Sequence, residues 1–190
     1  MHTPGHAVLN AALISGAVGV VDPALTAAVV AGAIAPDLPI LWLYARERWL
    51  RRTPEAAIWS GHYQRRVWQN LIHGAHSIPL ALAGAAAGWA FGSVAVVAFF
   101  ASMVAHSFAD LPVHAIDAHR HFLPLSQWRF VSPISYWDPR YHGRTVAAVE
   151  IALVAGAGVM LWAWPAVPVL AWYLWSYHHQ FLRRSAAVVV

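Results

Sequence analysis

A chain of 190 residues has room for one domain, and 59% hydrophobic against 11% charged residues excludes the composition of an ordinary soluble protein. The absence of cysteine excludes disulfide frameworks and thiolate metal sites, so any metal ion must be held by imidazole and carboxylate groups. The formal net charge of +4 comes with twelve basic residues, all of them arginine. Because these fall in predicted loops beside apolar segments, we expect no nucleic-acid partner.

Six apolar segments are predicted as helices, and they form three pairs along the chain. Each pair is joined by a short breaker, at Val21-Asp22-Pro23, at Gly92-Ser93 and at Trp164-Pro165, which predicts helical hairpins. The expected helices cover residues 6–21, 24–40, 74–89, 93–112, 145–163 and 166–182. The pattern predicts an all-α polytopic membrane bundle of about six helices arranged as three hairpins, with a single domain over residues 1–190. A soluble bundle of unusually apolar helices is the alternative.

The connections between the hairpins, residues 41–73 and 113–144, are expected to be loops, the second of them long and irregular. They hold all the arginines except Arg183 and Arg184, which follow the last expected helix. With six helices, every arginine falls on the same side of the membrane. The positive-inside bias predicts that this side and both termini are cytoplasmic, in a bacterial inner membrane, with the lipid bilayer as the partner.

Histidine and aspartate gather at the helix ends on this arginine-rich side. His6 opens the first expected helix, Asp37 closes the second, and His76 opens the third. His106 and Asp110 close the fourth helix and are four residues apart, so that one imidazole and one carboxylate share a helix face and reach the same ion. Helix ends that bring His and Asp to one level are what a metal site at the mouth of a bundle requires. The alternative is that these pairs form only hydrogen bonds between helices.

Other polar residues on the same side leave two interpretations open. Pro112 is expected to end the fourth helix and to let His114 and the segment 117–121 fold back toward the ion. The aromatic segment 122–139 is either an interfacial loop or a lid, with Arg129 or Arg140 placed for an anionic substrate group. Glu150, inside the fifth helix, is expected to be neutralised by an arginine or a histidine. Roles are not assigned to His62, His73, His121 and His142.

The order of these motifs resembles the bacterial membrane-bound metal-dependent hydrolases of the YdjM type. The resemblance covers most of residues 1–130 and rests on His6, Ala35-Pro36-Asp37, His76-Ser77, His106-x-x-x-Asp110 and Pro124-Leu125-Ser126. The family is distantly similar to the zinc-dependent phospholipase C and single-strand nuclease fold, an all-helical body around a metal cluster. The resemblance implies that the metal ligands are His6, Asp37, His76, His106, Asp110 and His114.

These observations lead to the hypothesis of a hydrolase that works at the cytoplasmic membrane face. It predicts one or two divalent ions, zinc first and manganese or iron as alternatives, and a phosphoester or lipid-linked substrate. Asp117 or His119 is the expected general base. The competing hypotheses are a non-catalytic metal-binding or transport protein, and a purely structural membrane protein.

Overall fold

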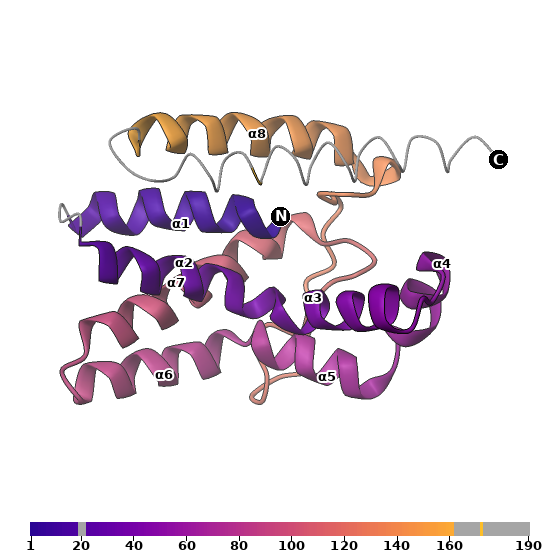
Figure 1. Ribbon diagram of the computed structural model, residues 1–190, viewed down its shortest axis with the longest axis horizontal. Helices are drawn as coiled ribbons and strands as arrows, with labels where there is room; N and C mark the ends of the chain where they lie inside the picture. Colours follow the sequence, from indigo (N-terminus) through magenta and orange to yellow (C-terminus); the bar gives the residue numbers. More distant parts are fainter. Residues whose placement is uncertain (19–21, 162–171, 173–190) are drawn as a thin grey trace.

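Helices build almost all of the regular structure in the computed structural model, which describes residues 1–18, 22–161 and 172. No strand occurs among these residues, which confirms the predicted all-helical class. The bundle contains α1 (Thr3–Val18), α2 (Pro23–Ile34), α6 (Ile78–Ala90), α7 (Val94–Asp110) and α8 (Gly143–Met160). In Figure 1 these helices run side by side, and α8 covers α1 while α6 and α7 form a hairpin.

Side-chain caps start the helices where the sequence has its breakers. The Asp22 carboxylate accepts the backbone N–H groups of Ala24 and Leu25 at 3.3 and 3.1 Å, and Pro23 occupies the first turn of α2. Ser77 caps α6 through the N–H of Leu80 at 3.2 Å, and its hydroxyl also donates to the carbonyl of Leu123. This second bond ties the start of α6 to the irregular segment that lies against the site.

Three helices are long and apolar enough to cross a membrane: Pro23–Leu50, Val94–Val113 and Gly143–Met160. A shorter apolar helix covers Ile78–Ala90. Large apolar side chains point outward from these helices, among them Trp89 at 81% exposure and Met160 at 77%. Apolar side chains turned toward the surroundings suit a bilayer and not water. The expected helix 166–182 lies outside the described residues.

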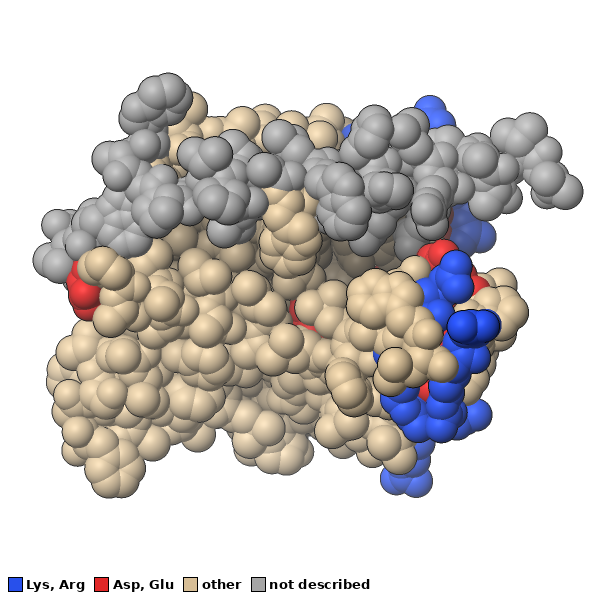
Figure 2. Space-filling view, viewed as in Figure 1, with Lys and Arg blue, Asp and Glu red and all other residues tan. Residues whose placement is uncertain are grey.

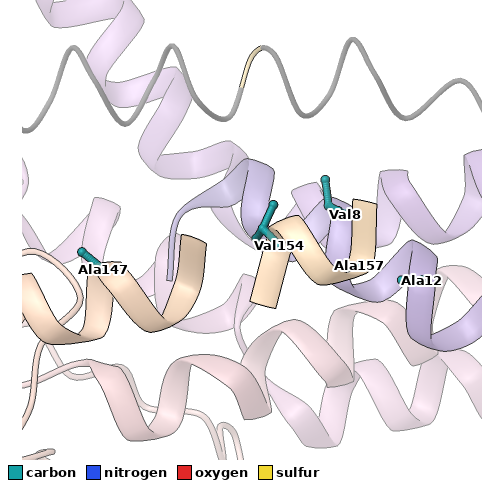
Figure 3. Packing of buried hydrophobic residues seen from close by; sticks show 5 residues of the cluster. All are labelled: Val8, Ala12, Ala147, Val154 and Ala157. Atoms are coloured by element: carbon teal, nitrogen blue, oxygen red, sulfur yellow. The ribbon is translucent and has the colours of Figure 1, made fainter. Parts of the chain in front are cut away.

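Small residues make up the interior of the bundle. Figure 3 shows α1 and α8 in contact through Val8, Ala12, Ala147, Val154 and Ala157, all of them buried. Short side chains let two helices approach closely, which is the usual packing of helices in membranes. Deeper in the bundle, the Asn10 amide donates to the carbonyl and hydroxyl oxygens of Ser102, both at 2.9 Å, and the Ser102 hydroxyl donates to the carbonyl of Val29 at 2.6 Å. This network joins α1, α7 and α2.

The prediction of a loop over residues 41–73 is wrong, because most of this segment is helical. After a 3-10 turn, η1 (Ala35–Asp37), the chain continues as α3 (Leu38–Ala45) and η2 (Arg46–Leu50), then α4 (Glu55–Ala57), η3 (Ile58–His62) and α5 (Arg66–Ala75). We call residues 38–75 the arm; in Figure 1 it extends beyond the bundle at one end. Its core is the buried Glu47 carboxylate, within 3.5 Å of nitrogen or hydroxyl atoms of Arg46, Arg51, Thr53 and His62. Hydropathy detects the apolar start of this segment but misses its later part, because α5 is amphipathic and the turns around Glu47 are held by buried charge.

Residues 114–138 contain no regular helix, and this segment closes the bundle on the side of the arm. It includes turns held by serine hydroxyls, such as Ser132, whose hydroxyl donates to the carbonyl of Pro112. After the 3-10 turns η4 (Leu111–Val113) and η5 (Pro139–Tyr141), the chain enters α8 at His142, whose φ is 61°. Figure 2 shows that the arginines gather at the end of the molecule where the arm lies.

Candidate metal centre

The predicted ligand residues come together at one end of the bundle although they are up to 108 positions apart in the chain. His6 lies in the first turns of α1, and Asp37 lies in the 3-10 turn between Pro36 and Pro39. Prolines cannot continue a regular helix, so this turn places a carboxylate in the interior. The remaining predicted ligands come from the end of α5, the end of α7 and the residue after η4: His76, His106, Asp110 and His114. All of the predicted histidine ligands and Asp110 are buried.

Four of these side chains form what we call the first subsite: Asp37, His76 and His106 offer ligand atoms within 4.8 Å of one another, and Asp110 Oδ2 lies beside the two imidazoles. The Nε2 atoms of His76 and His106 are 3.3 Å apart. Asp37 Oδ1 lies 3.5 Å from His76 Nε2 and 3.7 Å from His106 Nε2. Asp110 Oδ2 lies 3.6 and 3.1 Å from the same two nitrogens. Ligand atoms around a tetrahedral zinc ion with bonds of 2.0–2.1 Å are about 3.3 Å apart. The array therefore fits a small divalent ion held by two imidazoles and two carboxylates.

The orientation of the two imidazoles supports this fit. His76 Nδ1 donates to the carbonyl of Ile72 at 2.8 Å, and His106 Nδ1 donates to the carbonyl of Ala33 at 2.7 Å. Because Nδ1 is the donor in both rings, each ring turns its Nε2, the nitrogen left to bind an ion, toward the Nε2 of the other. Two lone pairs 3.3 Å apart repel unless a cation or a proton lies between them. Backbone carbonyls that fix the outer nitrogen are the usual support for metal-binding histidines.

The second oxygen of Asp110 faces a different set of groups, the second subsite. Asp110 Oδ1 lies 2.9 Å from His6 Nε2 and 3.4 Å from His114 Nε2. It also accepts a hydrogen bond from the amino group of Met1 at 2.7 Å. The His6 ring stacks on the His106 ring with centroids 3.6 Å apart, so the two subsites are adjacent. The Asp110 carboxylate can thus bridge two neighbouring ions.

Asp117, predicted as a candidate base, contacts His114. Its Oδ2 lies 3.0 Å from His114 Nδ1 and accepts the indole N–H of Trp137 at 2.8 Å. Burial raises the pKa of Asp117, but His114 and Trp137 outweigh burial and hold this pKa below its usual value. Burial lowers the pKa of His114, whereas the carboxylates of Asp110 and Asp117 raise it overall. A carboxylate behind an imidazole orients that imidazole and increases its basicity toward a metal.

His119, the other candidate base, lies against the first subsite. Its ring stacks on His76 with centroids 4.3 Å apart, and together with His76 and Asp110 it offers ligand atoms within 4.8 Å of one another. Burial, followed by the nearby His76 and His114, lowers the pKa of His119 well below its usual value. A neutral imidazole at this position can accept a proton or bind an ion.

The remaining histidines separate into those near the centre and those far from it. His73 and His121 surround His119, with ring centroids 5.6 and 5.7 Å from it, and both are buried. His62 pairs with Glu47 in the arm, and His142 begins α8. None of these four belongs to a group of ligand atoms within 4.8 Å in the part of the chain that the structure describes.

Glu150 has a histidine partner, as the sequence predicted, but this partner is His2, which sequence analysis did not single out. Glu150 Oε1 accepts the backbone N–H of His2 at 2.9 Å, and Oε2 lies 3.4 Å from His2 Nδ1. The pair fastens the N-terminal segment to α8. A histidine at the second position, ahead of the apolar run, gave no hydropathy signal.

A pocket of about 570 Å³ lies beside the metal centre, with His114, Asp117 and His119 in its lining. The arm and the segment 114–138 supply its other walls. Arg129 and Glu55 are the charged residues of these walls, beside the polar Ser60, Gln64 and Gln69. The aromatic and large apolar side chains of the lining are Ile40, Trp59, Tyr63, Ile116, Tyr136 and Trp137. Its size is in the range of pockets that hold small organic ligands. Arg140, the other predicted anion-binding residue, instead forms a bidentate ion pair with Asp138.

Comparison of the chain with protein-family models, with curated proteins and with solved structures gave no match. The fold and the candidate metal centre therefore rest on the structure itself. The likeness to the YdjM-type hydrolases remains a prediction from the order of the motifs.

Proposed function

We propose that the chain is a membrane-bound metal-dependent hydrolase that acts on a phosphoester or lipid-linked substrate. The observation that carries this proposal is the first subsite, where two imidazoles and two carboxylates converge with the spacing of ligands around one ion. A pocket lined by His114 and His119 lies beside this site and would place a bound substrate next to it. Zinc suits the donor set best, with manganese and iron as alternatives.

The residues of the site would divide the work between binding the ion and handling protons. A bound divalent ion would lower the pKa of a water molecule toward neutrality and polarise the scissile group. His76, His106, Asp37 and Asp110 would hold it, with His6 and His114 available for a second ion. His119, neutral and exposed to the pocket, would take the proton of the attacking water.

The bilayer partner and the location are part of the same proposal. Three helices are apolar and long enough to span a bilayer, which fits a bacterial inner-membrane protein. The arginines lie at the end that carries the site, which fits a cytoplasmic location of the site and of both termini.

Hydrolysis by the purified protein tests the proposal. Detergent-solubilised protein is stripped with a chelator, reloaded with zinc, manganese or iron, and assayed with chromogenic phosphomonoesters and phosphodiesters. We expect hydrolysis only after reloading, and a loss of about 100-fold or more in His119→Ala. Tight metal binding with no hydrolysis of any phosphoester or lipid would instead favour the non-catalytic metal-binding protein.

A further inference from the structure

Three arginines lie near enough to repel one another: Arg120 and Arg129 in the segment 114–138, and Arg66 at the start of α5. Arg129 also lines the pocket. The guanidinium of Arg120 is fixed between two amides, donating to Asn70 Oδ1 at 3.0 Å and to Gln127 Oε1 at 2.7 Å. Asn70 follows Arg66 by four residues, which is the same face of α5. Gln127 precedes Arg129 by two residues. The contacts of Arg120 thus hold it beside the turn of α5 that carries Arg66 and the stretch that carries Arg129, and both of these arginines repel its charge.

The positive charge of these three arginines, the arginine triad, is not balanced. Within the described part of the chain, no carboxylate oxygen lies within 4.0 Å of any of the three side chains. Elsewhere on this end of the molecule, by contrast, Glu47 and Asp138 pair with neighbouring arginines. Burial and then the repulsion by Arg129 and Arg66 lower the pKa of Arg120. Like charges held together without a counterion create a site for an anion.

Two buried hydrogen-bond donors in the same region lack an acceptor. Arg120 Nε is buried without a hydrogen-bond partner. His73 Nδ1 accepts the backbone N–H of Arg120 at 3.3 Å, so the neutral His73 ring carries its proton on Nε2, and this buried nitrogen is also without a partner. Buried polar groups in native proteins almost always have partners. The region offers donors and positive charge, which is the chemistry that recognises phosphate.

The pocket extends from Arg129 of the arginine triad to the side of the metal centre that holds His114 and His119. Arg129 lines the pocket together with His114 and His119, and Arg120 follows His119 directly in the chain. We propose that the arginine triad binds a second phosphoryl group of the substrate, whose scissile phosphoryl group lies at the metal centre, so that the substrate is an organic diphosphate. This rests on the proposed hydrolase function. The aromatic walls of the pocket would then face the organic part.

The reaction of such a substrate uses groups already on both sides of the pocket. The oxygen of water joins the terminal phosphorus, and the bond from that phosphorus to the bridging oxygen breaks. The electron pair stays on the leaving organic monophosphate, whose charge the arginine triad stabilises. One proton of the water passes to His119 and the other stays on the orthophosphate formed.

Binding of inorganic pyrophosphate and orthophosphate tests the proposal without any need for turnover. The full chain in phosphatidylcholine nanodiscs, loaded with zinc, is titrated with each anion by calorimetry. We expect pyrophosphate to bind about tenfold or more tightly than orthophosphate, and this difference to disappear in Arg129→Gln and Arg120→Gln. Arg48→Gln, which removes an exposed arginine of the arm, should keep it. Equal pyrophosphate affinity in wild type and Arg129→Gln would overturn the proposal; Arg129 is exposed, so its loss leaves the fold intact.

Two further arms separate this proposal from the proposed function and from a lipid ligand. The first arm titrates metal-free protein with orthophosphate. Binding that is lost in Arg129→Gln supports the arginine triad as a phosphate site, even if no metal ever binds and the hydrolase proposal fails. A second outcome is that the protein binds zinc and hydrolyses phosphoesters while its preference for pyrophosphate over orthophosphate does not depend on the arginines. That result would overturn the diphosphate proposal and leave the hydrolase proposal standing. If phosphatidylglycerol in the nanodiscs displaces the anions, the triad is a site for lipid headgroups, and the diphosphate proposal is likewise overturned.

Discussion

Gly32 of α2 lies directly against the backbone of α7, and adding one methyl group there should disturb the candidate metal centre. A Cβ atom at this position would lie 2.0 Å from the backbone carbonyl oxygen of Phe99. Ordinary carbon–oxygen contacts are about 3.3 Å or longer, so the helices would have to separate by roughly 1.3 Å. The obstacle is backbone, which cannot turn aside as a side chain does. Asp37 follows Gly32 by five residues and His106 follows Phe99 by seven, so the separation reaches the first subsite.

We expect Gly32→Ala to destabilise the protein by about 2 kcal/mol, because the overpacking exceeds the gain of about 1 kcal/mol from alanine in a helix. Metal–ligand distances tolerate only about 0.2 Å, so zinc affinity should fall by about 100-fold. Thermal unfolding in detergent and a competitive chelator titration measure the two effects. Gly156→Ala is the matched control, since its Cβ would meet nothing within 4 Å. Wild-type Tm and zinc affinity in Gly32→Ala would show that α2 and α7 are not in this contact.

Three further substitutions or conditions have definite outcomes. Asp117→Asn removes the carboxylate behind His114 and should weaken zinc binding at the second subsite by about 10–100-fold without abolishing it. A chelator titration measures this affinity, and an unchanged value would refute the positioning role. Hydrogen bonds with Asp110 and Asp37 outweigh burial and raise the pKa of His76 to about 9, so zinc must displace a proton below that pH. Calorimetry of zinc binding in two buffers of different ionisation enthalpy should show that protons are released, and the affinity for zinc should rise with pH toward 9. Zinc binding without proton release would contradict this assignment of His76. Glu47→Ala should destabilise the arm by about 2–3 kcal/mol, because it removes a buried carboxylate from its partners. Limited proteolysis should then cut within residues 46–62, and a variant as resistant to protease as the wild type would exclude Glu47 as the core of the arm.

The sequence was sufficient to predict the apolar helices and the end of the bundle where the site lies. The expected helix 93–112 agrees with α7 and η4, and the spacing of His106 and Asp110 places both on the face that meets the centre. Hydropathy and the period of a helix decide these features locally. The gathering of His6, Asp37 and His76 at one end of the bundle followed from their common position at helix ends, because helices paired as hairpins bring those ends to one level.

The features that the sequence did not reveal depend on contacts between distant segments. Residues 41–73 were predicted as a loop because their arginines and other polar residues hide the amphipathic helix α5, and because Glu47 gives no sign of the partners it collects. The pairing of Glu150 with His2 spans 148 positions, and no local pattern predicts it. Asp117 was a candidate base by residue type, whereas its contact with His114 depends on how the chain turns after Pro112.

Metal content is the most direct test of the central claim that the buried histidines and aspartates form a metal centre. Detergent-purified protein is analysed for its elements beside a His106→Ala, Asp110→Ala double variant and a His142→Asn control, in which asparagine tolerates the positive φ of 61°. The account predicts stoichiometric zinc, manganese or iron in wild type and control, and none in the double variant, with the helical content retained. Absence of metal from the wild-type protein even after reconstitution, or equal metal in the double variant, would contradict it.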